Sequence, residues 1–160
     1  MLFTTNEKNA ILQFVQNGGG LMIIADHDMS DRNFDGYDSP TIWNTMMGNG
    51  NPFGFYFNLE DFSQSTTNIP NLPNDSLLNG VFGTVSKVQF NGGTSMTLTP
   101  STNSTVKGIV YKTGSSFGNS NVMVAYSRYG LGKVVAIGDS SPEDDGTGDD
   151  NDVLYDGWLG

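Results

Sequence analysis

Aspartate side chains gather in two short stretches of the sequence, and carboxylates at this density are the groups from which proteins build divalent-cation sites. Five aspartates lie between residues 26 and 38, and eight acidic residues lie between 139 and 156. Arg32 is the one basic residue in either stretch, so the carboxylates repel one another unless a cation or exposure to water relieves them. The distribution of charge therefore makes a divalent cation the first ligand to consider.

The first stretch contains a pattern that resembles the first half of an EF-hand calcium loop. Such a loop places oxygen ligands at every second position and a glycine at the sixth position; here these are Asp31, Asn33, Asp35 and Gly36. The twelfth position is Ile42 instead of a bidentate Glu, and Asp38 is a substitute oxygen donor. The many oxygens and the flexible loop favour Ca²⁺, with Mg²⁺ as the alternative. The other interpretation is a loop of hydrogen-bonded turns.

Both acidic stretches follow continuous apolar runs, at 21–25 and 133–138, which are typical of strands buried on both faces. Ligands of open parallel sheets bind beyond the carboxyl ends of the strands. If the two strands are neighbours, Asp26 and Asp139 converge on one crevice. The second stretch then offers three further metal ligands, Asp144, Asp145 and Asp149. The alternative is that these aspartates cap turns or form a solvated acidic loop.

The candidate catalytic residues are His27, Asp28 and Ser140. His27 is the only histidine, and an adjacent carboxylate would orient it as a general base or a metal ligand. The block from Gly138 to Ser140 resembles the opening block of GDSL-type serine hydrolases, in which the serine attacks an ester. These residues give the alternative function, a metal-assisted or Ser-dependent hydrolase of carbohydrate or ester substrates. A structural histidine and a capped turn explain the same residues without catalysis.

Composition excludes several other classes. The absence of cysteine removes disulfides, thiolate metal sites and thiol nucleophiles. A net charge of -10 argues against nucleic acid, whose phosphates require Lys and Arg. No apolar run approaches the about 18 to 20 residues of a membrane span. The composition favours an extracellular or periplasmic bacterial protein, with carbohydrate or other domains of a longer protein as further partners.

Helical spacing, capping and β-propensity predict one α/β domain over residues 1–160. A capping box from Thr4 to Glu7 begins a helix that ends at the glycines 18–20. A second helix is expected over 41–47, and an irregular excursion over about 48–75. Further strands are expected over 85–90, 95–98, 106–112 and 122–128.

Two stretches carry a family resemblance. FTTNEKNAILQFVQNGGGLMIIADH resembles the helix–GGG–strand unit of the class I glutamine amidotransferase-like superfamily, and VMVAYSRYGLGKVVAIGDSS is similar to the hairpin and core strand of its non-amidotransferase branches in secreted bacterial proteins. The resemblance implies a three-layer flavodoxin-like α/β fold with a mainly parallel sheet and an added β-hairpin region. Because such folds begin with a strand, we expect a fragment that lacks its first strand. Without the cysteine nucleophile, amidotransferase activity is excluded.

Overall fold

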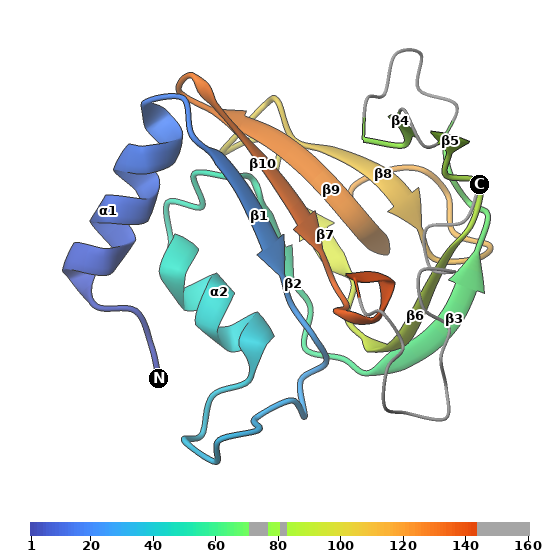
Figure 1. Ribbon diagram of the computed structural model, residues 1–160, viewed down its shortest axis with the longest axis horizontal. Coiled ribbons are helices and arrows are strands. Elements are labelled where there is room, and N and C mark those ends of the chain that lie inside the picture. The colour runs from blue at the N-terminus through green and yellow to red at the C-terminus, as the bar shows by residue number, and fades with distance from the viewer. Residues whose placement is uncertain (71–76, 81–82, 144–160) are drawn as a thin grey trace.

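The computed structural model describes residues 1–70, 77–80 and 83–143, in which two α-helices accompany a curled sheet of mixed strand direction (Figure 1). The elements are α1 (Thr5–Gln16), β1 (Gly20–Ile24), α2 (Ser39–Met47), β2 (Phe55–Phe57), β3 (Phe62–Thr66), β4 (Asn79–Gly80), β5 (Gly83–Thr84), β6 (Val88–Gly93), β7 (Met96–Leu98), β8 (Lys107–Tyr111), β9 (Val122–Tyr129), β10 (Gly132–Ile137) and the short 3-10 helix η1 (Ser141–Glu143). The fold is therefore mixed α/β.

The main sheet has the order β1-β10-β9-β7-β2, and β8 also pairs with β9. Within the described ranges only the β1–β10 pair is parallel, so the predicted mainly parallel sheet is not confirmed. The cause is the short connections. β9 and β10 are joined by a tight turn at Gly130 (φ +60°), and such a turn can join only antiparallel strands, whereas a parallel pair needs a crossover of a dozen or more residues.

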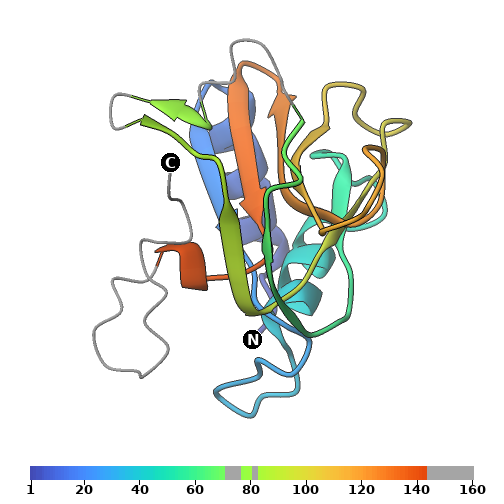
Figure 2. The ribbon, with the colours of Figure 1, turned by 90° about the vertical axis from the view of Figure 1, so that its right-hand side faces the viewer.

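The two faces of the main sheet are covered differently. Helices α1 and α2 pack on one face, where Val15 of α1 and Met46 of α2 belong to a single apolar cluster with β1, β2, β7, β9 and β10. On the other face Phe90 of β6 packs with Met123 and Ile137, and β3 pairs with β6 (Figure 2). Strands therefore lie where a flavodoxin-like fold has its second helical layer, and the predicted three-layer helical arrangement is not confirmed.

Both helices begin at polar residues, of which the sequence predicted only those of α1; α2 begins at Ser39, two residues before its expected start. Thr4 Oγ1 accepts the N–H of Glu7 at 3.3 Å, and Glu7 Oε2 accepts the N–H of Thr4 at 2.7 Å, which confirms the capping box of α1. Asp38 caps α2, and Pro40 occupies its first turn. In the described ranges no helix is long and apolar enough to cross a membrane.

The segment predicted as an irregular excursion, 48–75, contains two strands as far as it is described. β2 pairs with β7, and β3 pairs with β6. The aromatic side chains explain the difference: Phe53, Phe55 and Phe57 are at most 3% exposed and extend the core between the sheet and α2. Burial of these rings drives the segment into the sheet despite its Gly, Pro and Asn content.

Candidate functional site

The carboxyl ends of β1 and β10 meet at one edge of the sheet. The two strands are adjacent and parallel, with Ile24 paired to Ile137. Asp26 and Asp139 each lie two residues beyond these paired ends; burial and, to a smaller extent, the negative charge of Asp26 raise the pKa of Asp139. The neighbouring strands on which the predicted crevice depended are therefore present.

Asp139 is enclosed by protein donors at this edge. The residue is 1% exposed; its Oδ2 accepts the N–H of Asn91, and its Oδ1 accepts the N–H and the hydroxyl of Ser141 at 2.9 and 3.0 Å. Burial raises the pKa of the Asp139 carboxyl above its usual value, although these hydrogen bonds act in the opposite direction. Asp139 thus links the end of β10 to β6 and η1 through hydrogen bonds. These bonds explain why an acidic side chain is buried here without requiring a bound cation.

The glycine before Asp139 has a packing role. A Cβ at Gly138 would lie 1.8 Å from the carbonyl oxygen of Thr94, and the N–H of Thr94 donates to the Gly138 carbonyl at 2.7 Å. Ser140 is exposed, and no hydrogen bond joins it to His27 among the described residues. Close packing explains Gly138 and hydrogen bonding explains Asp139, and the hydrolase remains a prediction that no described contact supports.

His27 lies between the carboxylates of Asp26 and Asp61, and Asp61 was not predicted as part of the site. Its Nδ1 accepts the N–H of Met29 at 3.2 Å, so the neutral ring carries its proton on Nε2, which lies 3.5 Å from Asp26 Oδ1. Nδ1 is also 3.7 Å from Asp61 Oδ2. The predicted neighbour Asp28 takes part through its backbone, whose N–H donates to the Glu60 carbonyl at 3.3 Å.

The loop with the calcium-type pattern is folded around Asp31. Asp31 Oδ1 accepts the N–H of Asp35 at 3.1 Å, and Oδ2 accepts the N–H of Gly36 at 2.8 Å. Gly36 has φ +86°, as the sharp turn requires, and Phe34 has φ +56°, which is uncommon for a residue with a side chain. The first, fifth and sixth positions of the pattern are thus brought together.

The remaining oxygens of this loop have different partners. Asn33 Nδ2 donates to Asp35 Oδ2 at 3.1 Å, and the ammonium group of Met1 is also a donor to Asp35 Oδ2. Asp38 accepts the N–H of Thr41 at 2.7 Å and its hydroxyl at 3.0 Å, so its two oxygens serve the cap of α2. Both oxygens of Asp31 also accept backbone N–H groups, and Asp35 accepts the N–H of Tyr37, so a cation here would bind at the remaining lone pairs of Asp31 and Asp35 and at Asn33 Oδ1.

No group of three or more His, Asp or Glu side chains is arranged to hold a metal ion within residues 1–70, 77–80 and 83–143. The predicted ligands Asp144, Asp145 and Asp149 lie outside the described residues. A cation in loop 31–38 would therefore depend on two carboxylates together with an amide oxygen, a backbone carbonyl and water.

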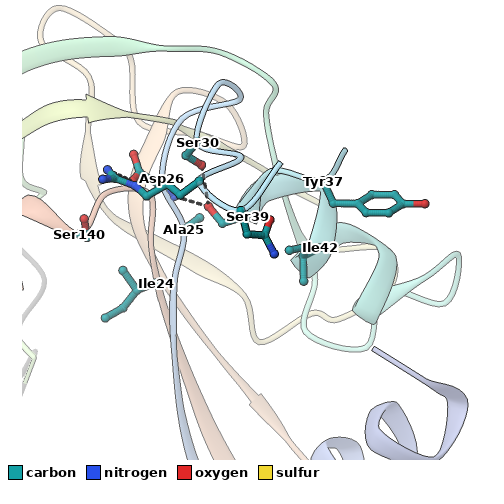
Figure 3. Close-up of a pocket in the computed structure, with 10 residues that line it drawn as sticks. Ile24, Ala25, Asp26, Ser30, Tyr37, Ser39, Ile42 and Ser140 are labelled. Atoms are coloured by element: carbon teal, nitrogen blue, oxygen red, sulfur yellow. Dashed lines mark hydrogen bonds and ion pairs between the residues drawn. The ribbon is translucent and has the colours of Figure 1, made fainter. Parts of the chain in front are cut away.

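An open pocket of about 360 Å³ lies beside Asp26, between the ends of β1 and β10 and the start of α2 (Figure 3). Asp26 Oδ2 is 3.4 Å from the guanidinium of Arg32, and the N–H of Asp26 donates to Ser39 Oγ at 2.8 Å. The polar lining of the pocket consists of Asp26, Ser30, Arg32, Asn33, Tyr37, Ser39 and Ser140, and its apolar lining of Ile24, Ala25 and Ile42. The pocket combines one charge of each sign with several hydroxyl groups.

Glu60 was not predicted as part of this edge. Its Oε1 accepts the N–H of Ser95 at 3.0 Å, and its Oε2 lies 2.8 Å from Lys112 Nζ, which sits 3.8 Å above the Phe62 ring. Burial alone would raise the pKa of Glu60, but hydrogen bonds from Lys112 and Ser95 outweigh it and hold the pKa below its usual value. The partners are 35 and 52 residues away, so no local pattern identifies them.

Comparison with known proteins gives a likeness of fold. No family model and no curated protein matches the chain. A solved structure described as the mmIFT52 N-terminal domain has a TM-score of 0.58 at 13% identity, covering 86% of this chain and 60% of that one. The GH42 β-galactosidase Gan42B from G. stearothermophilus gives 0.46 at 14% identity, covering 86% of this chain and 17% of that one. The cytoplasmic protein STM1381 from Salmonella typhimurium LT2 gives 0.48 at 16% identity, covering 84% and 50%.

The chain thus spans at most 60% of the length of these three proteins. At 13% identity, the likeness to the mmIFT52 N-terminal domain shows a similar fold and nothing about function. The TM-scores of Gan42B and STM1381 are below 0.5, so these two proteins support no conclusion about this chain.

Proposed function

We propose that loop 31–38 binds one divalent cation, Ca²⁺ in preference to Mg²⁺, at the carboxyl edge of the sheet in an α/β module of a secreted or periplasmic bacterial protein. The observation that carries the proposal is the folding of the loop around Asp31, whose carboxylate accepts the N–H groups of Asp35 and Gly36. A calcium loop needs such a turn at its sixth position, because the oxygen ligands of the first, third and fifth positions must face one point.

The ligands would be side-chain oxygens of Asp31, Asn33 and Asp35 and the backbone carbonyl of Tyr37, the seventh position of the pattern. Water would complete the six to eight ligands that Ca²⁺ takes. Two carboxylates predict weak binding, in the range of about 10⁻⁴–10⁻³ M in which extracellular calcium modules work.

Loop 31–38 contributes three residues to the wall of the pocket, Arg32, Asn33 and Tyr37, and ends at the cap of α2. Neutralising its carboxylates would remove their mutual repulsion and fix this wall relative to β1. We therefore expect the cation to order a binding surface, with no step of catalysis assigned to it.

The test is a calorimetric titration of CaCl₂ and of MgCl₂ into EDTA-treated protein, with thermal unfolding followed in parallel. We expect one equivalent of Ca²⁺ to bind and to raise the unfolding temperature. Asp31→Asn should abolish both effects, because it removes ligand charge with little change in shape. Asp28→Asn is the matched control, since it removes an equal charge nearby without touching the loop. No heat and no thermal shift with the wild-type protein would contradict the proposal.

The relation to the class I glutamine amidotransferase-like superfamily is also a proposal. It is supported by the way α1 leads through glycines directly into β1, and by the hairpin β9–β10, whose second strand lies parallel to β1. The chain has no cysteine, so the relation carries no amidotransferase activity. An experimental structure of the full-length protein would test it: a further parallel strand beside β1 is expected, and a complete protein without one would contradict the relation.

A further inference from the structure

We infer that the pocket between the ends of β1 and β10 and the start of α2 binds a neutral polyhydroxylated ligand of the size of a monosaccharide. The inference goes beyond the cation proposal and does not require it. Asp26, Ser39 and Ser140 lie outside loop 31–38, whereas Arg32, Asn33 and Tyr37 of the lining belong to it, so binding is tested with and without Ca²⁺ (Figure 3).

The charged pair in the pocket fits a vicinal diol. A ligand hydroxyl donates to the Asp26 carboxylate, and a neighbouring hydroxyl accepts from the Arg32 guanidinium. The two groups are 3.4 Å apart, and the Arg32 side chain is 82% exposed, whereas that of Asp26 is 16% exposed. A loose ion pair with one exposed partner contributes little to stability. A ligand that inserts between Asp26 and Arg32 therefore sacrifices little favourable interaction energy. Asp26 therefore provides a fixed acceptor and Arg32 a movable donor.

The hydroxyl groups of the pocket divide into supporting and available ones. Ser30 Oγ donates to the His27 carbonyl at 2.6 Å, and Ser39 Oγ accepts the Asp26 N–H at 2.8 Å; the two oxygens lie 3.4 Å apart. These serines are engaged by the protein and hold the wall. Ser140 is exposed at the opposite side and has no hydrogen-bond partner among the described residues, so its hydroxyl is available to a ligand.

Apolar side chains complete the lining. Ile24 is 37% exposed at the end of β1, and Ala25 and Ile42 line the same pocket. A sugar ring presents C–H groups on its faces and hydroxyls at its rim, which matches an apolar surface beside convergent polar groups. The volume of about 360 Å³ is at the lower end of the range for small-molecule sites, which limits the ligand to one or two rings.

Charged ligands fit this pocket less well than neutral ones. The net charge of -10, with five aspartates in the segment that walls the pocket, repels anions. The guanidinium of Arg32 stands at the position that an ammonium group would need beside Asp26. A ligand whose hydroxyls both donate and accept satisfies the two charged groups together.

The test uses saturation-transfer NMR and calorimetry on the complete chain, with D-glucose, D-galactose, D-mannose and myo-inositol as probes, in Ca²⁺ and again in EDTA. We expect at least one probe to bind with millimolar affinity. Asp26→Asn should weaken that binding about tenfold, the value of one charge-assisted hydrogen bond. Glu7→Gln, which removes one negative charge from the first turn of α1, lies outside the pocket and keeps a residue compatible with the capping box, is the matched control and should leave it unchanged.

Three results would overturn the inference. The first is the absence of saturation transfer to all four probes from folded wild-type protein, and the second is equal binding by the Asp26→Asn and wild-type proteins. The third is binding of spermidine, included as a cationic probe, in place of the sugars. Sugar binding that persists in EDTA while Ca²⁺ fails to bind would support the pocket and contradict only the cation proposal.

Discussion

Removal of the Asp139 carboxylate should destabilise the whole sheet edge, because this one side chain connects three segments. It accepts the N–H of Asn91, the N–H of Ser141 and the Ser141 hydroxyl. In Asp139→Ala the hydroxyl retains a partner, since it already lies 3.3 Å from the Asn91 carbonyl. The two backbone N–H groups have no such alternative among the described contacts.

The magnitude follows from those two donors. A buried N–H left without an acceptor costs about 1–3 kcal/mol, so about 2–6 kcal/mol is the upper range for this pair, which is only partly buried. Part of this is offset, because burial raises the pKa of Asp139 and so disfavours its charged form in the folded protein. We therefore expect Asp139→Ala to lower the free energy of unfolding by about 2–4 kcal/mol at neutral pH.

The pH dependence has a definite sign. With a folded pKa above its unfolded value, Asp139 stabilises the folded state fully below the unfolded pKa, and this contribution is lost as pH rises through the folded pKa. The difference between wild type and Asp139→Ala should therefore be larger at about pH 4 than at pH 7.

Urea unfolding followed by fluorescence at both pH values measures this difference, with Asp28→Ala as a control for the general loss of an acidic side chain. A loss below about 0.5 kcal/mol for Asp139→Ala, which is the range of ordinary surface substitutions, would refute the assigned role. A difference that grows from pH 4 to pH 7 would refute the direction of the pKa shift.

Three further predictions concern the fold. Gly138→Ala should destabilise by about 3 kcal/mol or more in urea unfolding, because its Cβ would meet the Thr94 carbonyl at 1.8 Å; near wild-type stability would show that the close approach is wrong. The lowered pKa of Glu60 gives stability that is present above its unfolded pKa and lost as pH falls through the folded pKa, so Lys112→Met should cost less than about 1 kcal/mol at pH 7 and progressively less as the pH is lowered; a cost that grows on acidification in urea unfolding would contradict this. Thr4→Ala should cost about 1 kcal/mol and reduce the helical circular dichroism signal; an unchanged unfolding midpoint would contradict the capping box.

Local features of the fold could be predicted because their physical causes lie within a few residues. The capping box of α1, the strands β1, β9 and β10, and the aspartates beyond β1 and β10 all follow from short patterns. The predicted burial of β1 on both faces was wrong: Ile23 is buried, but Met22 is 47% and Ile24 37% exposed, because β1 lies at the end of the sheet order and one of its faces is left partly uncovered. Strand direction could not be obtained in this way, since it depends on which strands meet. The hairpin turn at Gly130 determines one antiparallel pair, but the antiparallel pairings of β7 and β8 with β9 depend on long-range burial.

The candidate site likewise has features that follow from local sequence and features that depend on long-range contacts. The pattern of loop 31–38 and the shared edge of Asp26 and Asp139 were predicted from spacing and from strand ends. The role of Asp139 was not, because its principal partner, Asn91, comes from a strand 48 residues earlier. Asp61 and Glu60 were missed for the same reason. Their partners, His27 and Lys112, come from other segments of the chain.

Terbium luminescence tests the cation proposal most directly, because Tb³⁺ occupies calcium sites and emits strongly only when an excited aromatic ring lies within a few ångströms. Tyr37 is at the seventh position of the loop and would be that ring. We predict sensitised emission on excitation of the wild-type protein, quenched by excess Ca²⁺, lost in Asp31→Asn and strongly reduced in Tyr37→Phe. Absence of emission from the wild type, or emission that persists in both variants, would place any cation elsewhere and contradict the account.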